Sequence, residues 1–193
     1  MHLWFWGSIC CILVGVLPDP WIRMLAYDRL AILEQGQYWR LWTAHLTHFS
    51  WSQLFVDTGM FAALGYVLRT YVTDTHLLKK MAWAMPLILI GLMLWLPNIQ
   101  GYRGLSAVVS MMWIMLAAFV WQKADGRSLH LLLVAGLLGL FVFRLLLDAG
   151  AEKITISHLP VGVFVLWQVH ALGALAGAVA WYLSQTAPRD LDR

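Results

Sequence analysis

Long apolar runs separated by short polar connections dominate the chain. The hydrocarbon core of a membrane needs about 20 mainly apolar residues per helix. Six runs approach this length, at residues 3–18, 50–71, 81–99, 105–122, 129–147 and 161–184. The pattern predicts an all-α integral membrane protein with six transmembrane helices. No internal repeat is visible, so we expect a single domain over residues 1–193.

One polar connection is much longer than the others. Residues 19–49 mix charged side chains with Trp, Tyr and Leu, a pattern typical of short amphipathic pieces that lie in the membrane interface. We therefore expect a long interfacial first loop and no seventh span. The first run, MHLWFWG and onward, starts without Lys or Arg and ends without a small-residue cleavage pattern. It is expected to be a retained helix rather than a cleaved signal peptide.

Composition agrees with a membrane protein. Hydrophobic residues make up 61% of the chain and charged residues 12%, whereas soluble domains are about one quarter charged. Mean hydropathy is +0.71. The net charge of +3 comes without a basic run interleaved with aromatic residues, so nucleic acid is not an expected partner. The only cysteines, Cys10 and Cys11, are adjacent, and no disulfide between them is expected.

The distribution of Lys and Arg predicts the orientation. Cytoplasmic loops of membrane proteins carry an excess of these residues. One set of connections holds seven and the other set five, but the five are spread over a longer stretch. Both termini are therefore expected to be cytoplasmic, with residues 101–106 on the extracytoplasmic side. The first set is Arg69, Lys79, Lys80, Lys123, Arg127, Arg189 and Arg193, and the second is Arg23, Arg29, Arg40, Arg103 and Lys153.

Three ionisable residues fall inside apolar runs, where charge is costly and a functional role is the default hypothesis. They are Asp57, Arg144 and His170. Arg144 lies near the expected outer end of its helix, so it can extend to the interface or pair with Asp148 one turn away. His170 shares a helix face with Gly173 and Gly177, and such small residues let another helix approach closely.

Ser106 begins the run 105–122 and has two interpretations. Serine in a membrane helix is commonly a small packing residue. At a helix N-terminus, however, free backbone N–H groups and the helix dipole can stabilise an oxyanion next to the hydroxyl. His170 is expected at a similar depth from the same side of the membrane. A Ser106–His170 contact is therefore possible, and His170 would then serve as the base that activates the hydroxyl.

These residues resemble the motifs of the rhomboid intramembrane serine proteases. Gly104-Leu105-Ser106-Ala107 is similar to the family's Gly-x-Ser-Gly motif, with Ala107 where glycine is usual. The segment from His170 through Gly173 to Gly177 is similar to its His-x-x-Gly-x-x-x-Gly motif. Trp39-Arg40, followed by His48-Phe49-Ser50, is similar to its first loop and the entry to its second helix.

The resemblance implies a six-helix rhomboid-like bundle and a Ser–His dyad without a third carboxylate. Ser106 would be the nucleophile and His170 the base, while Gly104, Gly173 and Gly177 would serve helix packing. No cofactor or metal is implied. The form Tyr-Arg-Gly-Leu-Ser is most like the rhombosortase branch. This branch implies a bacterial inner-membrane enzyme that acts on transmembrane or C-terminally anchored proteins with a glycine-rich sorting tail.

The second apolar run departs from the family pattern. Rhomboids commonly have His and Asn there, four residues apart, to help hold the oxyanion, and this chain has Gln53 and Asp57. Gln53 can donate an N–H, but Asp57 donates only when it is protonated. Asp57 could instead pair with a cation or orient Gln53. His48 is a further candidate donor, or it is an interfacial residue that anchors the loop.

Two other classes of function remain open at this stage. An inactive rhomboid-like protein that binds transmembrane clients would fit the altered Gln53 and Asp57 positions. A metal or haem site is conceivable because His45 and His48 have helical spacing and His170 could face them. No His-Glu-x-x-His pattern is present, and no metal is expected.

Overall fold

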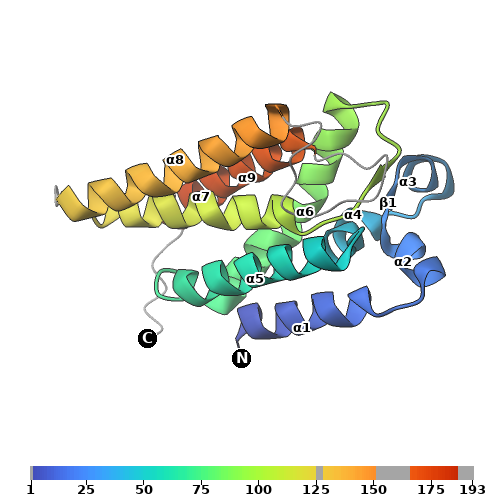
Figure 1. Ribbon diagram of the computed structural model, residues 1–193, viewed down its shortest axis with the longest axis horizontal. Helices are drawn as coiled ribbons and strands as arrows, with labels where there is room; N and C mark the ends of the chain where they lie inside the picture. The colour runs from blue at the N-terminus through green and yellow to red at the C-terminus, as the bar shows by residue number, and fades with distance from the viewer. Residues whose placement is uncertain (1, 125–127, 151–165, 187–193) are drawn as a thin grey trace.

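The computed structural model describes residues 2–124, 128–150 and 166–186, and these are mainly α-helical (Figure 1). Each predicted run overlaps one of the longer helices, and successive long helices run in opposite directions. Residues 161–165 of the last run, and the cations Arg127, Lys153, Arg189 and Arg193, lie outside the described residues. The helices are α1 (Leu3–Gly15), α5 (Trp51–Leu68), α6 (Asp74–Trp95), α7 (Ser106–Gln122), α8 (Ser128–Gly150) and α9 (Trp167–Thr186).

The prediction that the third run begins at residue 81 was wrong. Helix α6 begins at Asp74, because the Thr73 side chain caps it by accepting a hydrogen bond from the backbone N–H of His76. Lys79 and Lys80 therefore lie in the first turns of a helix rather than in a loop. Hydropathy located the apolar part of the helix and missed its polar beginning.

The long first loop consists of short pieces, as expected. They are α2 (Asp19–Leu25), β1 (Tyr27–Asp28), α3 (Arg29–Gln35), α4 (Arg40–Thr43) and the 3-10 turn η1 (Ala44–Leu46). The buried Arg40 holds them together by donating to the carbonyl oxygens of Arg23 and Ala26, each at 2.6 Å. Strand β1 pairs antiparallel with β2 (Gly101–Tyr102), so Tyr27 lies opposite Tyr102. This pairing ties the loop to the segment just before Ser106.

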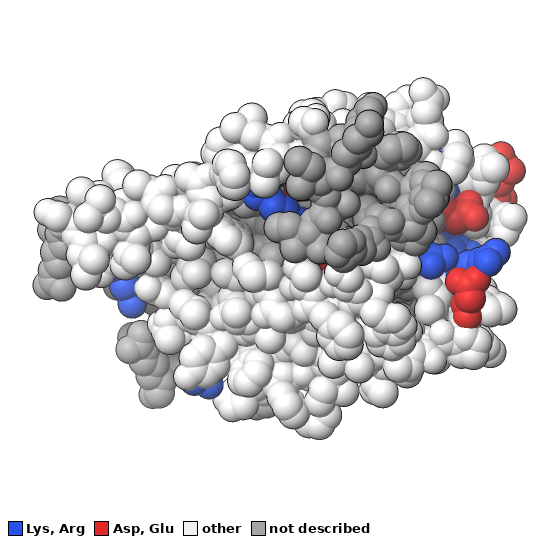
Figure 2. All heavy atoms as spheres, viewed as in Figure 1, with Lys and Arg blue, Asp and Glu red and all other residues white. Residues whose placement is uncertain are grey.

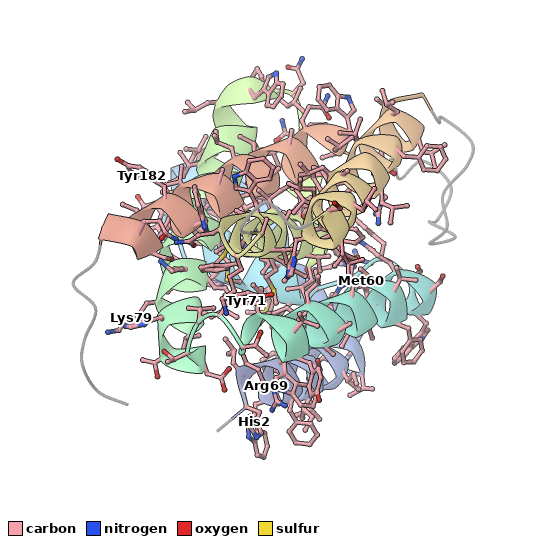
Figure 3. All side chains as sticks on the ribbon, turned by 90° about the vertical axis from the view of Figure 1, so that its left-hand side faces the viewer. His2, Met60, Arg69, Tyr71, Lys79 and Tyr182 are labelled. Carbon is pink, nitrogen blue, oxygen red and sulfur yellow. The ribbon has the colours of Figure 1, made fainter. Side chains whose placement is uncertain are left out.

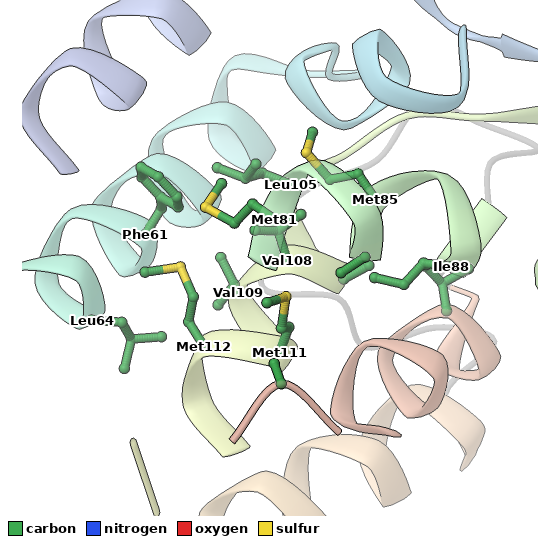
Figure 4. Packing of buried hydrophobic residues seen from close by; sticks show 14 of the residues in the cluster. Phe61, Leu64, Met81, Met85, Ile88, Leu105, Val108, Val109, Met111 and Met112 are labelled. Atoms are coloured by element: carbon green, nitrogen blue, oxygen red, sulfur yellow. The ribbon is translucent and has the colours of Figure 1, made fainter. Parts of the chain in front are cut away.

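Helix α7 forms the centre of the packed core (Figure 4). Its residues Val108, Met111, Met112 and Met115 have no solvent exposure. They meet apolar side chains from α5 and α6 in one continuous cluster, which includes Phe61, Leu64, Met81, Met85 and Ile88. A helix surrounded in this way is apolar on all sides, and its backbone is held by neighbours on several faces.

Helices α7 and α9 run parallel and touch along their length. A Cβ on Gly173 would overlap the carbonyl oxygen of Ala107, and one on Gly177 would overlap that of Met111. At the far end, the side-chain amides of Gln122 and Gln185 exchange two hydrogen bonds of 2.6 and 3.0 Å. Parallel packing brings the first turns of α7 and α9 to the same end of the molecule.

Two helices in the described part of the chain, α6 and α8, are long and apolar enough to span a membrane, and α1 and α7 are shorter apolar helices. Most of α8 faces outward, and its exposed apolar side chains include Leu129, Leu132, Leu140 and Leu146. On the face shown in Figure 2, charged side chains gather mainly at the end that holds α2 and α3. Figure 3 looks onto the opposite end, where His2, Arg69 and Lys79 lie.

Candidate active site

Ser106 is the first residue of α7, directly after the loop that follows β2. The first hydrogen bond of the helix runs from the N–H of Val109 to the carbonyl oxygen of Leu105. The N–H groups of Ser106 and the next two residues therefore lack the intrahelical partners that later residues have. Ser106 itself is half-buried. Its hydroxyl thus lies at the positive end of the most deeply buried helix.

Gly104 brings the side chains around Ser106 close together. Its φ of +139° lies in a region that side-chain-bearing residues rarely adopt. A Cβ there would lie 2.6 Å from Nε2 of Gln53, 3.4 Å from Oδ2 of Asp57 and 3.7 Å from Oγ of Ser106. Gly104 was expected to serve helix packing, but it lies in the loop before α7 and lets that loop approach α5.

Tyr102 fixes the same loop from the other side. Its buried hydroxyl donates to the carbonyl oxygen of Gly104 at 2.8 Å. Burial raises the pKa of Tyr102, while hydrogen bonds from the Ser106 side chain and the Ala107 backbone act in the opposite direction. The Ser106 hydroxyl therefore has the Tyr102 oxygen as a neighbour. Tyr102 lies four residues before the serine, in the Tyr-Arg-Gly-Leu-Ser segment, and its sequence position alone predicted no role in the site.

His45 connects three segments beneath the loop. It has no solvent exposure, its Nε2 lies 3.1 Å from the carbonyl oxygen of Met85, and its ring packs edge-on against Tyr102. Burial lowers its pKa to about 4, and backbone hydrogen bonds to Met85 and Gly104 oppose that shift. The backbone N–H of Gly104 also donates to the carbonyl oxygen of Ala44. His45 thus fixes the loop before Ser106 to α6.

His170 lies in the first turn of α9, one turn before Gly173, and is 4% exposed. Its Nδ1 lies 2.9 Å from Oδ2 of Asp148, near the end of α8. The same carboxylate oxygen accepts from Nε of Arg144 at 3.1 Å, so the pairing of Arg144 with Asp148 is present. The family resemblance implied no carboxylate at the histidine. The sequence held one signal for it: Asp148 and His170 flank the same connection, at the same end of the molecule.

Gln53 joins the start of α5 to the loop before Ser106. Its Oε1 accepts from the backbone N–H of Phe49 at 2.9 Å, and its Nε2 donates to the carbonyl oxygen of Arg103 at 3.1 Å. The side-chain amide has two N–H donors, so one remains for another acceptor. Gln53 therefore positions the loop, whatever it contributes to an oxyanion.

Asp57 and His48 form a buried polar pair beside Gly104. Nε2 of His48 lies 3.5 Å from Oδ2 of Asp57, and the two residues are 8% and 5% exposed. This separation is longer than an ordinary hydrogen bond. Nδ1 of His48 and the hydroxyl of Thr58 are also buried, and neither has a hydrogen-bonding partner among the residues that the structure describes. Buried polar groups in this state are unusual and often mark a functional site or a place for water.

The histidines that the structure describes do not gather into a metal centre. In the described part of the chain, no group of three or more His, Cys, Asp and Glu side chains is placed to hold a metal ion. His45 bonds to the Met85 carbonyl, His48 lies beside Asp57, and His170 lies against Asp148. Each ring thus has a separate partner.

No protein-family model matches the chain, and no curated protein matches it significantly.

Proposed function

We propose that this protein is an intramembrane serine endopeptidase in which Ser106 is the nucleophile and His170 the general base. The observation that carries the proposal is the parallel contact of α7 and α9 at Gly173 and Ala107. It places Ser106 and His170 in the first turns of adjacent helices, at one end of the molecule. A serine at a helix N-terminus and a buried histidine at the same end of an adjacent helix are the two groups that a serine hydrolase uses for acyl transfer.

The proposed reaction follows from these groups. The Ser106 hydroxyl turns from Tyr102 toward Nε2 of His170, and its oxygen attacks the scissile carbonyl carbon as the proton passes to Nε2. The tetrahedral intermediate then collapses: the C–N bond breaks, and His170 gives its proton to the leaving amine. Water attacks the resulting ester, gives a proton to His170, and the acid product leaves as the Ser106 oxygen recovers a proton.

The oxyanion would be held mainly by backbone. The N–H of Ser106 points out of the first turn of α7, where the helix dipole favours negative charge. The remaining N–H of Gln53 is a second donor, because the other is bonded to Arg103. Asp57 contributes only in its neutral form, since an ionised carboxylate would repel the oxyanion. His48, beside Asp57, is the third candidate donor.

The membrane setting is supported by the apolar helices. The six long helices of the described residues alternate in direction, and the outward-facing side of α8 is apolar. Together with the Lys and Arg distribution, this favours a six-span rhomboid-like bundle with both termini cytoplasmic. The site would then open to the extracytoplasmic side of a bacterial inner membrane.

The substrate class rests on the sequence resemblance. Substrates would be transmembrane or C-terminally anchored proteins, and secreted proteins with a glycine-rich sorting tail are favoured. Glycine has low helix propensity, so such a segment leaves its helix at low cost to enter the site.

The test is cleavage of a glycine-rich, C-terminally anchored substrate by the full chain in the membrane. We expect cleavage by the wild type and loss of it in Ser106→Ala and in His170→Ala. Ser184→Ala is a matched control, because that hydroxyl bonds the Ala180 carbonyl within α9, far along the helix from His170. If both site variants still cleave, the Ser–His assignment is wrong.

A fluorophosphonate probe separates an enzyme from a client-binding protein. It should label wild-type Ser106 and leave Ser106→Ala unlabelled. If the folded wild type is not labelled under conditions that label a known serine protease of the same kind, the inactive client-binding function is the better explanation.

A further inference from the structure

Asp148 lies against His170, the candidate base. The carboxylate projects from the last turns of α8 to Nδ1 of His170, with 2.9 Å between the atoms. Both side chains are almost fully buried, at 8% and 5% exposure. A carboxylate at this distance in a site with little water makes a stronger bond than it would on a surface.

We propose that Asp148 is a positioning residue that fixes the tautomer and the orientation of His170; this inference rests on the proposed function. An ionised carboxylate only accepts hydrogen bonds, so Nδ1 of His170 is the donor and carries the proton. In the neutral ring, Nε2 then has a free lone pair. That nitrogen is the one required to take the proton from Ser106.

Arg144 completes the arrangement by holding the carboxylate. It lies one turn before Asp148 on α8, and its Nε donates to the same oxygen that faces His170. The Arg144 side chain is 41% exposed, while the Asp148 side chain is buried. A permanently charged partner favours the ionised form of Asp148, and a second contact restricts its rotation. The order of contacts is therefore Arg144, Asp148 and His170.

The Asp148 carboxylate also stabilises the positive charge that His170 acquires during the reaction. His170 becomes positive when it accepts the Ser106 proton, in the first turn of a helix, where the dipole disfavours positive charge. Asp148 offsets this by accepting from Nδ1, and no proton moves to the carboxylate. The site is thus a Ser–His–Asp triad whose members come from α7, α9 and α8.

The first test compares Asp148→Asn with the wild type, using the glycine-rich anchored substrate. Asparagine has nearly the same shape, but its amide can donate to Nδ1 and favours the tautomer in which Nε2 carries the proton. We expect kcat to fall by about 10²–10⁴-fold with KM changed less than about threefold, because orientation of the base acts on the chemical step. The matched control is Asp74→Asn, a carboxylate at the opposite end of the molecule that accepts from the Leu3 N–H, and it should keep wild-type kcat.

The second test starts from the wild-type protein. Nitrogen NMR of ¹⁵N-histidine-labelled wild-type protein, with His170 assigned by its loss in His170→Gln, should show Nδ1 protonated and Nε2 unprotonated. In Asp148→Asn, the tautomer ratio should shift toward protonated Nε2. A role in stability alone would change the unfolding temperature and leave the tautomer as it is.

The outcomes separate the two proposals. If Ser106→Ala and His170→Ala abolish cleavage but Asp148→Asn keeps kcat within threefold of wild type, the role of Asp148 is wrong and the protease remains. A wild-type His170 with its proton on Nε2 also overturns the role of Asp148, even where Asp148→Asn fails to fold. If Ser106→Ala and His170→Ala still cleave, the proposed function itself fails.

Discussion

Gly173 of α9 lies directly against the carbonyl oxygen of Ala107, the residue after Ser106. No side chain separates the two backbones there, because a Cβ on Gly173 would overlap that oxygen. One missing methyl group therefore sets the spacing of the helices that carry Ser106 and His170.

Gly173→Ala should destabilise the protein by about 1–3 kcal/mol, because the new methyl forces two backbones apart in a packed core. Labelling of Ser106 by a fluorophosphonate should fall more than stability alone explains. Thermal unfolding in detergent and the labelling rate measure the two effects. Gly136→Ala in α8 is the matched control: a Cβ there would meet no atom of the described residues within 4 Å, so helix propensity should make it neutral or stabilising. Equal behaviour of the two variants would contradict the contact.

Gly104→Ala should impair the site through backbone strain. A φ of +139° costs a side-chain-bearing residue about 1–3 kcal/mol, and the methyl would also press on the Gln53 amide. We expect lower stability and at least a tenfold lower labelling rate. Gly101→Ala, three residues earlier, should be tolerated, since its nearest neighbour would be the Tyr27 carbonyl oxygen at 3.8 Å. A Gly104→Ala protein with normal labelling would remove this loop from the site.

The buried His45 should make the protein less stable in acid. Burial lowers the pKa of His45 in the folded protein to about 4. The unfolded chain, with a histidine pKa of about 6.5, binds more protons between these values. The stability that neutral His45 contributes is therefore fully present above pH 6.5. It is lost as the pH falls toward 4, and the total loss is about 3 kcal/mol.

Thermal unfolding of the wild type and of His45→Gln, recorded from pH 7 to pH 4, checks this sign. The glutamine side chain can still donate to the Met85 carbonyl but does not titrate, so its curve should be flatter. His76→Gln, at an exposed position of α6, should keep the wild-type slope. A wild-type protein that gains stability on acidification would show that the assignment to His45 is wrong.

Gln53→Ala should reduce the cleavage rate by about tenfold, or about 1.4 kcal/mol in the barrier, without abolishing it. The change removes the tether to the Arg103 carbonyl, so the loop before Ser106 loses one of its supports. Gln53→Glu keeps an acceptor for the Phe49 N–H but loses the donor, and should be at least as slow. Gln35→Ala, which affects only an exposed contact with Gln37, should cleave at the wild-type rate.

Periodicity and hydropathy located every long helix because each helix presents apolar side chains over most of its length. They misplaced the start of α6, where capping by Thr73 rather than apolarity decides the boundary. They missed the pairing of Tyr27 with Tyr102, since a two-residue ladder leaves no periodic signal. The local sequence pattern of a segment indicates whether its surroundings are apolar. It does not indicate which distant segment pairs with it.

The residues of the candidate site also divide into those that the local sequence pattern indicated and those that depend on contacts between distant segments. His170 was singled out because it is ionisable in an apolar run, and Ser106 because it begins such a run at a helix N-terminus. Arg144, in the fifth run, pairs with Asp148, which was one of its two expected roles. The glycine at 104 was misassigned to helix packing, since its φ depends on the loop geometry around it. The contact of Asp148 with His170 joins two helices, and it depends on how they pack rather than on the local pattern of either one.

Helix α7 is enclosed by its neighbours, and the loop before Ser106 is held by Tyr102, His45 and Gln53. The backbone that carries the serine is therefore held by several neighbouring segments. In the proposed reaction the substrate peptide has to unwind and bend to reach Ser106, because the backbone around the serine is held in place. The choice of substrate among membrane proteins would then depend more on how readily the cleaved segment unwinds than on its amino-acid sequence.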